Sequence, residues 1–206
     1  MTRRISRRTF AAAGMGLVGA SMATGAFAQD QGQQETKQGP VEAEFERDYD
    51  APSFKPSWRN PQVNRTMAQD FVIYAHSDLE MTKQLLEREP ALINAAIDWG
   101  AGDFETGLGG ASHMGRKDIV KFLLGHGARI DIFCAAMMGM LPAVKAMLEL
   151  EPALIDAKGP HGFTLHFHAQ VGQEDAKPVL DYLQSVKEVE LRPIPFLQGR
   201  GDKSDG

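Results

Sequence analysis

Between residues 67 and 183, hydrophobic and polar residues follow one another with the spacing of amphipathic helices rather than strands. The pattern predicts four pairs of helices joined by short turns. The expected pairs are 67–76 with 79–89, 106–115 with 118–124, 133–139 with 142–149, and 159–172 with 177–183. Since one pair cannot bury its apolar side alone, we expect the pairs to pack against one another.

The residues at the ends of these segments indicate where the helices begin and end. Asp78 and Thr106 have short polar side chains that can cap the first turn of the helix that follows. Pro90 lacks an N–H and ends the helix before it. Gly115 and Gly127 can adopt the left-handed backbone conformation that terminates a helix.

A twelve-residue segment occurs twice in the chain. Residues 83–94 and residues 145–156 are identical at eight of twelve positions, and a looser copy begins at Lys121. The steps between the copies are 38 and 24 residues, with a mean of 31. A period of this size is typical of stacked helical repeats. We therefore expect Leu85, Leu123 and Met147 to meet along one continuous apolar spine.

The second helix pair resembles the ankyrin repeat, whose motif reads T-P-L-H-x-A-A-x-x-G, then I-V-x-x-L-L, then G-A. The residues in register with it are Thr106, Leu108, Ala111, Gly115, Ile119, Val120, Leu123, Leu124, Gly127 and Ala128. Gly107 and Gly109 stand where the motif has Pro and His. The resemblance implies an all-α fold, an ankyrin-type helical repeat solenoid of about four repeats, similar to exported bacterial ankyrin-repeat proteins. It also implies a binding scaffold, without specifying the partner.

The segments that flank the repeats differ in composition. Residues 29–65 are polar and proline-containing, so we expect a flexible lead in which Phe54 and Trp58 lie across the first pair as an N-terminal cap. Residues 66–185 form the expected repeat domain. In residues 186–206, Pro193 and Pro195 indicate an edge strand or a covering arm, followed by a disordered tail.

Residues 1–28 resemble an export signal. Arginines precede an apolar stretch rich in Ala and Gly, which ends at a small-x-small sequence, Ala-Phe-Ala, at residues 26–28. Residues 6–10, Ser-Arg-Arg-Thr-Phe, are similar to the twin-arginine signal, and a general secretory signal is the alternative. Glycines dilute the stretch too far for a stable membrane anchor. We expect export to the bacterial periplasm by the twin-arginine route.

The charge of the chain restricts its partners. The whole sequence has 22 basic and 27 acidic residues. Removing residues 1–28 takes away four arginines and no acidic residue, which leaves 18 basic residues and a net charge of −9. This excess disfavours nucleic acid and anionic membrane surfaces. The single cysteine, Cys134, excludes an internal disulfide, and its apolar neighbours predict a core position.

The histidines offer at most a weak metal site in the sequence. His166 and His168, with His161 and His113, are the nearest approach to a ligand set. Residues two apart on a helix point in different directions, so one ion could not easily bind both. No run of three or four ligands with zinc spacing occurs. The sequence therefore predicts neither a metal ion nor a cofactor.

Three carboxylates near two aromatic residues raise the possibility of acid–base chemistry. Asp98, Asp103 and Glu105 surround Trp99 and Phe104. Burial against the aromatic rings would raise the pKa of a carboxyl and suit it to proton transfer. The alternative is a solvated turn. Because no nucleophile or phosphate-binding loop accompanies these residues, no catalytic residue is predicted.

The predicted function is a non-catalytic protein-binding module that acts as a scaffold or adaptor through its finger loops and inner helices. The candidate binding residues are Trp99, Asp103, Phe104, Glu105, His113, His161 and Phe163. The acidic excess favours a basic or neutral protein partner. Two alternatives stay open: a metal-dependent or acid–base hydrolase on the repeat scaffold, and a maturation chaperone for another exported protein.

Overall fold

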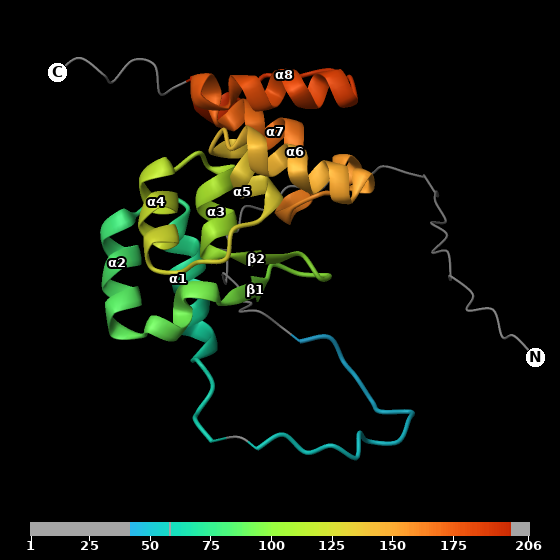
Figure 1. The fold of residues 1–206 in the computed structure, drawn as a ribbon. Helices are drawn as coiled ribbons and strands as arrows, with labels where there is room; N and C mark the ends of the chain where they lie inside the picture. The colour runs from blue at the N-terminus through green and yellow to red at the C-terminus, as the bar shows by residue number, and fades with distance from the viewer. Residues whose placement is uncertain (1–41, 58, 199–206) are drawn as a thin grey trace, which may run out of the picture. The chain divides into compact units, whose positions relative to one another are not determined.

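The computed structural model describes residues 42–57 and 59–198. Its elements, in chain order, are α1 (Arg65–Ala75), α2 (Leu79–Arg88), η1 (Pro90–Asn94), β1 (Ala96–Asp98), β2 (Phe104–Thr106), α3 (Gly107–His113), α4 (Lys117–Gly125), α5 (Ile132–Met137), α6 (Leu141–Leu150), η2 (Pro152–Asp156), η3 (Pro160–Gly162), α7 (Leu165–Val171), η4 (Gln173–Ala176), α8 (Lys177–Val186) and α9 (Pro195–Gln198). Elements labelled η are short 3₁₀ helices. The fold class is all-α, with one two-stranded hairpin in the described part (Figure 1). The expected export signal, Trp58 and the expected tail after residue 198 lie outside the described residues.

The helix ends follow the residues that predict them. Asp78 and Thr106 each accept a hydrogen bond from a backbone N–H in the first turn of the next helix, at 2.9 and 3.1 Å. Gly115 and Gly127 have φ angles of +66° and +90°, in the left-handed region that terminates a helix. Within the described segments, no helix is both long and apolar enough to cross a bilayer.

The two copies of the twelve-residue segment adopt the same local conformation. α2 and α6 are each followed by a 3₁₀ helix that begins at a proline. Just before it, Glu89 has φ −141° and ψ 89°, and Glu151 has φ −140° and ψ 86°. Each carboxylate accepts a hydrogen bond from the backbone N–H two residues ahead, at 3.1 and 3.2 Å. The sequence repeat is therefore a repeat of local structure.

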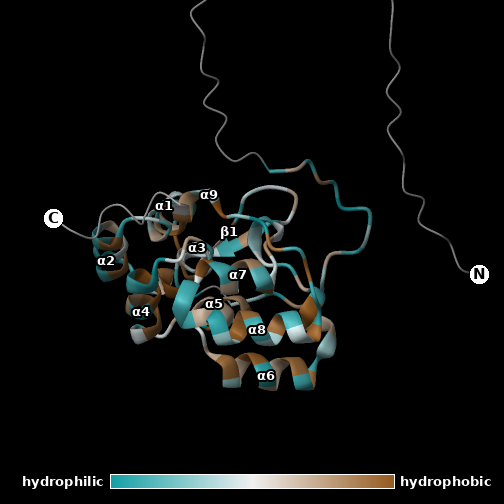
Figure 2. Ribbon diagram, turned by 90° about the horizontal axis from the view of Figure 1, so that it is seen from above, coloured by the Kyte–Doolittle hydropathy of each residue, from teal (hydrophilic) through white to brown (hydrophobic). Residues whose placement is uncertain are grey.

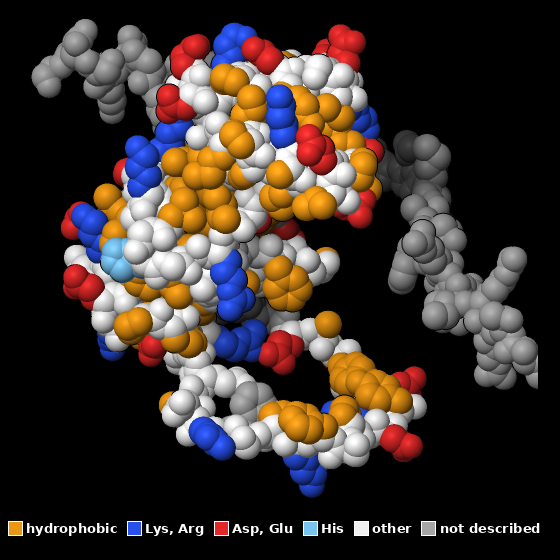
Figure 3. Space-filling view, viewed as in Figure 1, with side chains coloured by type: hydrophobic (Ala, Val, Ile, Leu, Met, Phe, Trp, Pro, Cys, Tyr) orange, Lys and Arg blue, Asp and Glu red, His pale blue; other side chains and the backbone are white. Residues whose placement is uncertain are grey.

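The helices from α1 to α8 pack in two rows. In the inner row, α1, α3, α5 and α7 each contact the next member. In the outer row, α2 contacts α4, and α6 contacts α8 (Figures 1 and 2). Hydrophobic and hydrophilic residues share the ribbons of α6 and α8 in Figure 2, as expected for amphipathic helices that cover a core. On the face in Figure 3, hydrophobic side chains gather between the positions of α4 and α6.

The core is divided into two hydrophobic clusters instead of the single spine that we expected. Leu123 is fully buried in the first cluster and Leu85 packs against that cluster, whereas Met147 packs against the second. α5 contributes to both clusters, with Cys134 in the first and Ala135 in the second. In the outer row the division falls between α4 and α6, where the step between the sequence copies is the shorter one.

The segments outside the helix pairs behave differently from each other. Phe54 is 79% exposed, so the prediction that it covers the first pair is wrong. At the other end, Ile194 is buried in the first cluster and Phe196 packs against it. The described residues after α8 form no strand, because Pro193 and Pro195 cannot donate to a sheet. The sequence predicted either an edge strand or a covering arm for this segment, and the segment forms a covering arm.

Candidate functional site

Six of the seven candidate binding residues form one cluster, in which five surround the buried carboxylate of the sixth, Glu105. The six are Trp99, Asp103, Glu105, His113, His161 and Phe163. They come from the β1–β2 hairpin, the last residue of α3 and the loop that contains η3. The seventh, Phe104, is 64% exposed and does not join them.

The hairpin separates Glu105 from Phe104. β1 and β2 pair antiparallel, with Ala96 opposite Thr106 and Asp98 opposite Phe104. Because successive residues of a strand point to opposite faces, Glu105 is only 1% exposed while its neighbour Phe104 faces solvent. The connection that follows the first helix pair is therefore a regular hairpin with one buried and one exposed face.

Asp98 shapes the turn of this hairpin. Its Oδ1 accepts hydrogen bonds from the N–H groups of Gly100 at 2.8 Å and Gly102 at 3.1 Å. Both glycines, and Ala101 between them, have positive φ angles. The sequence left two roles open for the carboxylates of this segment, acid–base chemistry or a solvated turn. Asp98 has the second role, because its carboxylate binds the backbone of the turn.

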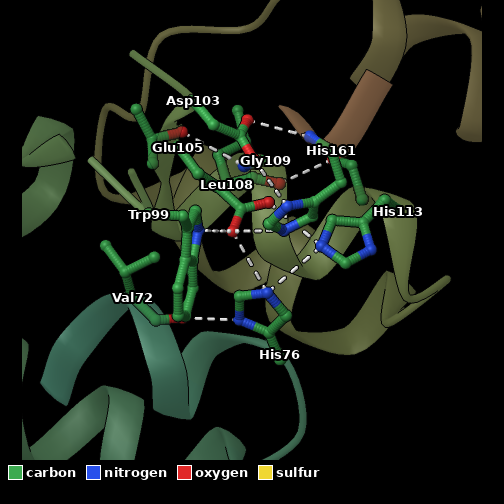
Figure 4. Close-up of polar contacts among 11 residues, drawn as sticks. Val72, His76, Trp99, Asp103, Glu105, Leu108, Gly109, His113 and His161 are labelled. Atoms are coloured by element: carbon green, nitrogen blue, oxygen red, sulfur yellow. Dashed lines mark hydrogen bonds and ion pairs between the residues drawn. The ribbon is translucent and has the colours of Figure 1, made fainter. Parts of the chain in front are cut away.

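Four side chains approach the Glu105 carboxylate (Figure 4). Trp99 Nε1–H donates a hydrogen bond to Oε2 at 2.7 Å. His76 Nε2 lies 3.2 Å and His161 Nε2 3.4 Å from the same oxygen. His113 Nε2 lies 3.0 Å from Oε1, and also 3.1 Å from His76 Nε2. Three imidazole nitrogens and one carboxylate thus meet at a single point.

His76 is a member of this cluster that no pattern in the sequence singled out. It follows the last residue of α1, and its Nδ1 lies 2.7 Å from the carbonyl oxygen of Val72. Its ring packs against α3 at Gly110, which has no side chain. A Cβ at this position would lie only 2.7 Å from His76 Nδ1. His76 and His113 are 37 residues apart, close to the 38-residue step between the first two sequence copies. That spacing is the signal that could have paired them.

Asp103 holds His161 in place. Its Oδ1 accepts the backbone N–H of His161 at 2.9 Å, and its Oδ2 accepts the Nδ1–H at 2.8 Å. His161 has φ +57°, an uncommon conformation for a residue with a side chain. The ring of His161 lies 5.7 Å from that of Trp99 and 5.2 Å from that of His113. The η3 loop is thus attached to the hairpin through one residue.

The electrostatics keep the Glu105 carboxyl ionised in this arrangement, which disfavours it as a general acid. Burial alone would raise its pKa, but the contacts with His113 and His76 outweigh burial and hold the pKa far below its usual range. Burial lowers the pKa of His76, and the contact with Glu105 more than compensates, so that the pKa is raised. The alternative in which burial against the aromatic rings raises the pKa of a carboxyl therefore does not describe Glu105.

The adjacent pair His166 and His168 is bonded elsewhere. His166 Nε2 lies 2.9 Å from the carbonyl oxygen of Lys187, and His168 Nδ1 lies 2.8 Å from that of Thr164. Both histidines are buried. They satisfy the backbone at two different places, as the spacing argument predicts.

Cys134 fills the core position predicted for it. It is fully buried, and burial raises its pKa to about 11. A thiol with this pKa is protonated near neutral pH and is a poor nucleophile.

One group among the described residues has the composition and spacing of a metal-ligand set. The ligand atoms of His76, Glu105, His113 and His161 all lie within 4.8 Å of one another. Glu105 and His113 are buried, while the His76 and His161 side chains are 19% and 30% exposed. An ion could therefore enter from the solvent side.

A search of protein-family models finds no match to this chain, and no curated protein sequence matches it either.

Proposed function

We propose that this chain is an ankyrin-type helical repeat module that binds a protein partner in the bacterial periplasm, after export by the twin-arginine route. The capped helix pairs, the inner row from α1 to α7 and the left-handed glycines at 115 and 127 support the repeat assignment. So does the identical conformation of the two twelve-residue copies. The periplasmic location depends on the sequence of residues 1–28.

The observation that carries the binding function is the exposure of aromatic residues on a braced hairpin. Phe104 is 64% and Trp99 43% exposed, although both belong to a hairpin anchored by the buried Glu105. Contact residues on loops over a rigid scaffold are typical of recognition surfaces. Aromatic side chains serve well as anchors because they bury a large area with few rotatable bonds. Phe104 is therefore the expected anchor of the partner.

The charge around the hairpin indicates the chemistry of the partner. Asp98 and Asp103 flank the turn, and the whole chain carries a net charge of −5. Complementary charge increases association rates and disfavours like-charged partners. A neutral or basic protein surface is the expected partner.

The test compares capture of partners by the wild-type chain with capture by Phe104→Ala. Leu150→Ala is the matched control, because Leu150 is 85% exposed on α6 and lies outside the hairpin. We expect one or more periplasmic proteins to be retained by the wild-type chain and Leu150→Ala but lost with Phe104→Ala. Each candidate is then purified and its dissociation constant measured against the three chains. If no purified candidate discriminates Phe104→Ala from Leu150→Ala, the hairpin is not the binding surface.

A further inference from the structure

We propose that His76, Glu105, His113 and His161 bind one divalent transition-metal ion, with Zn²⁺ as the reference ion. The ligands would be three imidazole nitrogens and one carboxylate oxygen, supplied by the ends of α1 and α3, by β2 and by η3. This site is independent of partner binding as proposed above. It occupies the buried face of the hairpin, whereas Phe104 lies on the exposed face.

The distances between the candidate ligand atoms suit an ion at their centre. Tetrahedral zinc with bonds of about 2.0–2.1 Å keeps neighbouring ligand atoms roughly 3.3–3.4 Å apart. His76 Nε2 lies 3.1 Å from His113 Nε2 and 3.2 Å from Glu105 Oε2. His161 Nε2 lies 3.4 Å from the same oxygen. These pairs are already close to the separation that tetrahedral zinc requires, and all four ligand atoms lie within 4.8 Å of one another.

The positions of the protons on the imidazole rings favour a bound ion over a network of hydrogen bonds among these side chains. A carbonyl or carboxylate oxygen only accepts, so His76 Nδ1 donates its proton to Val72 and His161 Nδ1 donates to Asp103. When both rings are neutral each has only this one N–H, so their Nε2 atoms turn lone pairs toward the Glu105 carboxylate. Lone pairs and a carboxylate repel one another unless a cation lies between them. Asp103, His161 and the ion would form the carboxylate–histidine–metal arrangement that orients many metal-binding histidines.

Protonating the rings instead does not satisfy every contact. If His76 and His113 both carried protons on Nε2, two N–H donors would face each other at 3.1 Å. Only one of the two can therefore donate across this contact. A cation removes the conflict because both nitrogens then act as electron-pair donors to it.

Glu105 supplies a second, independent indication. Its Oε1 is buried and has no hydrogen-bond partner, although His113 Nε2 is 3.0 Å away, because the geometry does not align an N–H with it. An unsatisfied buried carboxylate oxygen is costly. The Trp99 N–H occupies Oε2 at 2.7 Å and fixes the carboxylate with Oε1 beside His113. A bound ion would satisfy this oxygen.

The ligand chemistry restricts the kind of ion and its role. Three imidazoles with one carboxylate suit Zn²⁺ and neighbouring ions such as Co²⁺, Ni²⁺ and Cu²⁺. Mg²⁺ and Ca²⁺ prefer shells of oxygen atoms. Four protein ligands close a tetrahedral shell, which is typical of structural zinc. The ion would then join the η3 loop and the hairpin to the ends of α1 and α3.

The test uses the untagged full chain after treatment with a chelator. It is titrated with Zn²⁺ in competition with an indicator, and with Co²⁺ observed by its visible absorption. The variants are Glu105→Gln, which keeps an acceptor for Trp99, and His161→Asn, because Asn tolerates a positive φ. We expect the wild-type chain to bind one ion, with each variant weaker by more than about 100-fold, beyond the loss typical of an outer hydrogen-bond partner.

His126→Ala is the matched control. His126 Nδ1 lies 2.8 Å from the carbonyl oxygen of Phe122, four residues earlier, which is the contact that His76 makes with Val72. We expect His126→Ala to bind Zn²⁺ like the wild-type chain, and circular dichroism to show that all variants fold. If Glu105→Gln does not fold, His161→Asn decides, since its side chain is partly exposed. The proposal is overturned if the folded wild-type chain does not bind one ion. It is also overturned if His161→Asn keeps wild-type affinity.

Discussion

His166 and His168 stand two residues apart on one helix, whereas His76, His113 and His161 come from three distant segments. The neighbouring pair points its ring nitrogens at two separate backbone carbonyls. The distant three point their Nε2 atoms at one carboxylate. Closeness in sequence therefore identifies the histidines that support the fold, and the packing of helix pairs brings together those that can share a ligand.

The comparison predicts losses of stability of different size in the metal-free protein. His168 is 1% exposed, and its ring lies 5.2 Å from that of Phe133. His168→Ala leaves a cavity and removes one of the two hydrogen bonds that the Thr164 carbonyl accepts, so we expect a loss of about 2–4 kcal/mol of unfolding free energy. His161→Asn, at a partly exposed side chain, should cost less than about 1 kcal/mol.

Urea unfolding of both variants in the presence of a chelator measures these losses. The m-values should match that of the wild-type chain, which shows that the same surface unfolds. Equal losses for the two variants would mean that the two groups of histidines play the same structural role.

The second prediction concerns the pH dependence of stability. Burial lowers the pKa of His168 from 6.5 to about 4, against a smaller opposing effect of its hydrogen bond to Thr164. The unfolded chain therefore binds a proton at this residue between pH 6.5 and about 4 when the folded chain does not. The unfolding free energy should fall as the pH falls through this window, by about 1.4 kcal/mol per pH unit and about 3 kcal/mol in total.

His168→Asn isolates this contribution, because an amide keeps a donor near Thr164 but does not titrate. Urea unfolding at several pH values between 7 and 4, with a chelator present, gives the two curves. The other titrating groups contribute to both chains, so the difference between the slopes belongs to His168. Parallel curves would show that His168 is not protected from protonation by the fold.

A smaller effect is expected from the residue that orients His161. Asp103→Asn keeps an acceptor for the backbone N–H of His161 but weakens the hold on its ring. Loss of such an outer partner typically lowers metal affinity by about 10- to 100-fold. Asp98→Asn is the matched control, since Asp98 bonds only to its own turn. Zinc titration of both variants measures the difference, and equal affinities would remove Asp103 from the site.

The parts of this molecule that the sequence predicts are those governed by neighbouring residues. Asp78 and Thr106 cap helices because their acceptors lie a few residues away. The conformation of Glu89 recurs at Glu151 because the following residues, Pro-Ala-Leu-Ile, recur as well. Such interactions depend on a short stretch of chain, and they hold wherever the stretch is placed.

The site depends on distances that no local pattern contains. His76 has no nearby partner in the sequence, and it reaches Glu105 because α1 packs on α3 with the hollow at Gly110 between them. Gly110 stands at a position that the ankyrin motif leaves open, and its lack of a side chain makes room for the imidazole ring. Likewise the break between α4 and α6 follows from the spacing of whole pairs and is invisible in either helix alone.

The smallest expected effects come from two substitutions that distinguish the exposed face of the hairpin from its buried face. Phe104→Ala changes an exposed side chain, so we expect the unfolding free energy to change by less than about 0.5 kcal/mol and zinc affinity to remain that of the wild-type chain. Trp99→Phe keeps an aromatic ring but removes the N–H that fixes Glu105 Oε2, and it should weaken zinc binding by up to about tenfold. Partner capture should show the reverse order, with the larger loss for Phe104→Ala. Measured together, the two variants distinguish separate faces from a single shared surface, on which each substitution would weaken both activities in the same proportion.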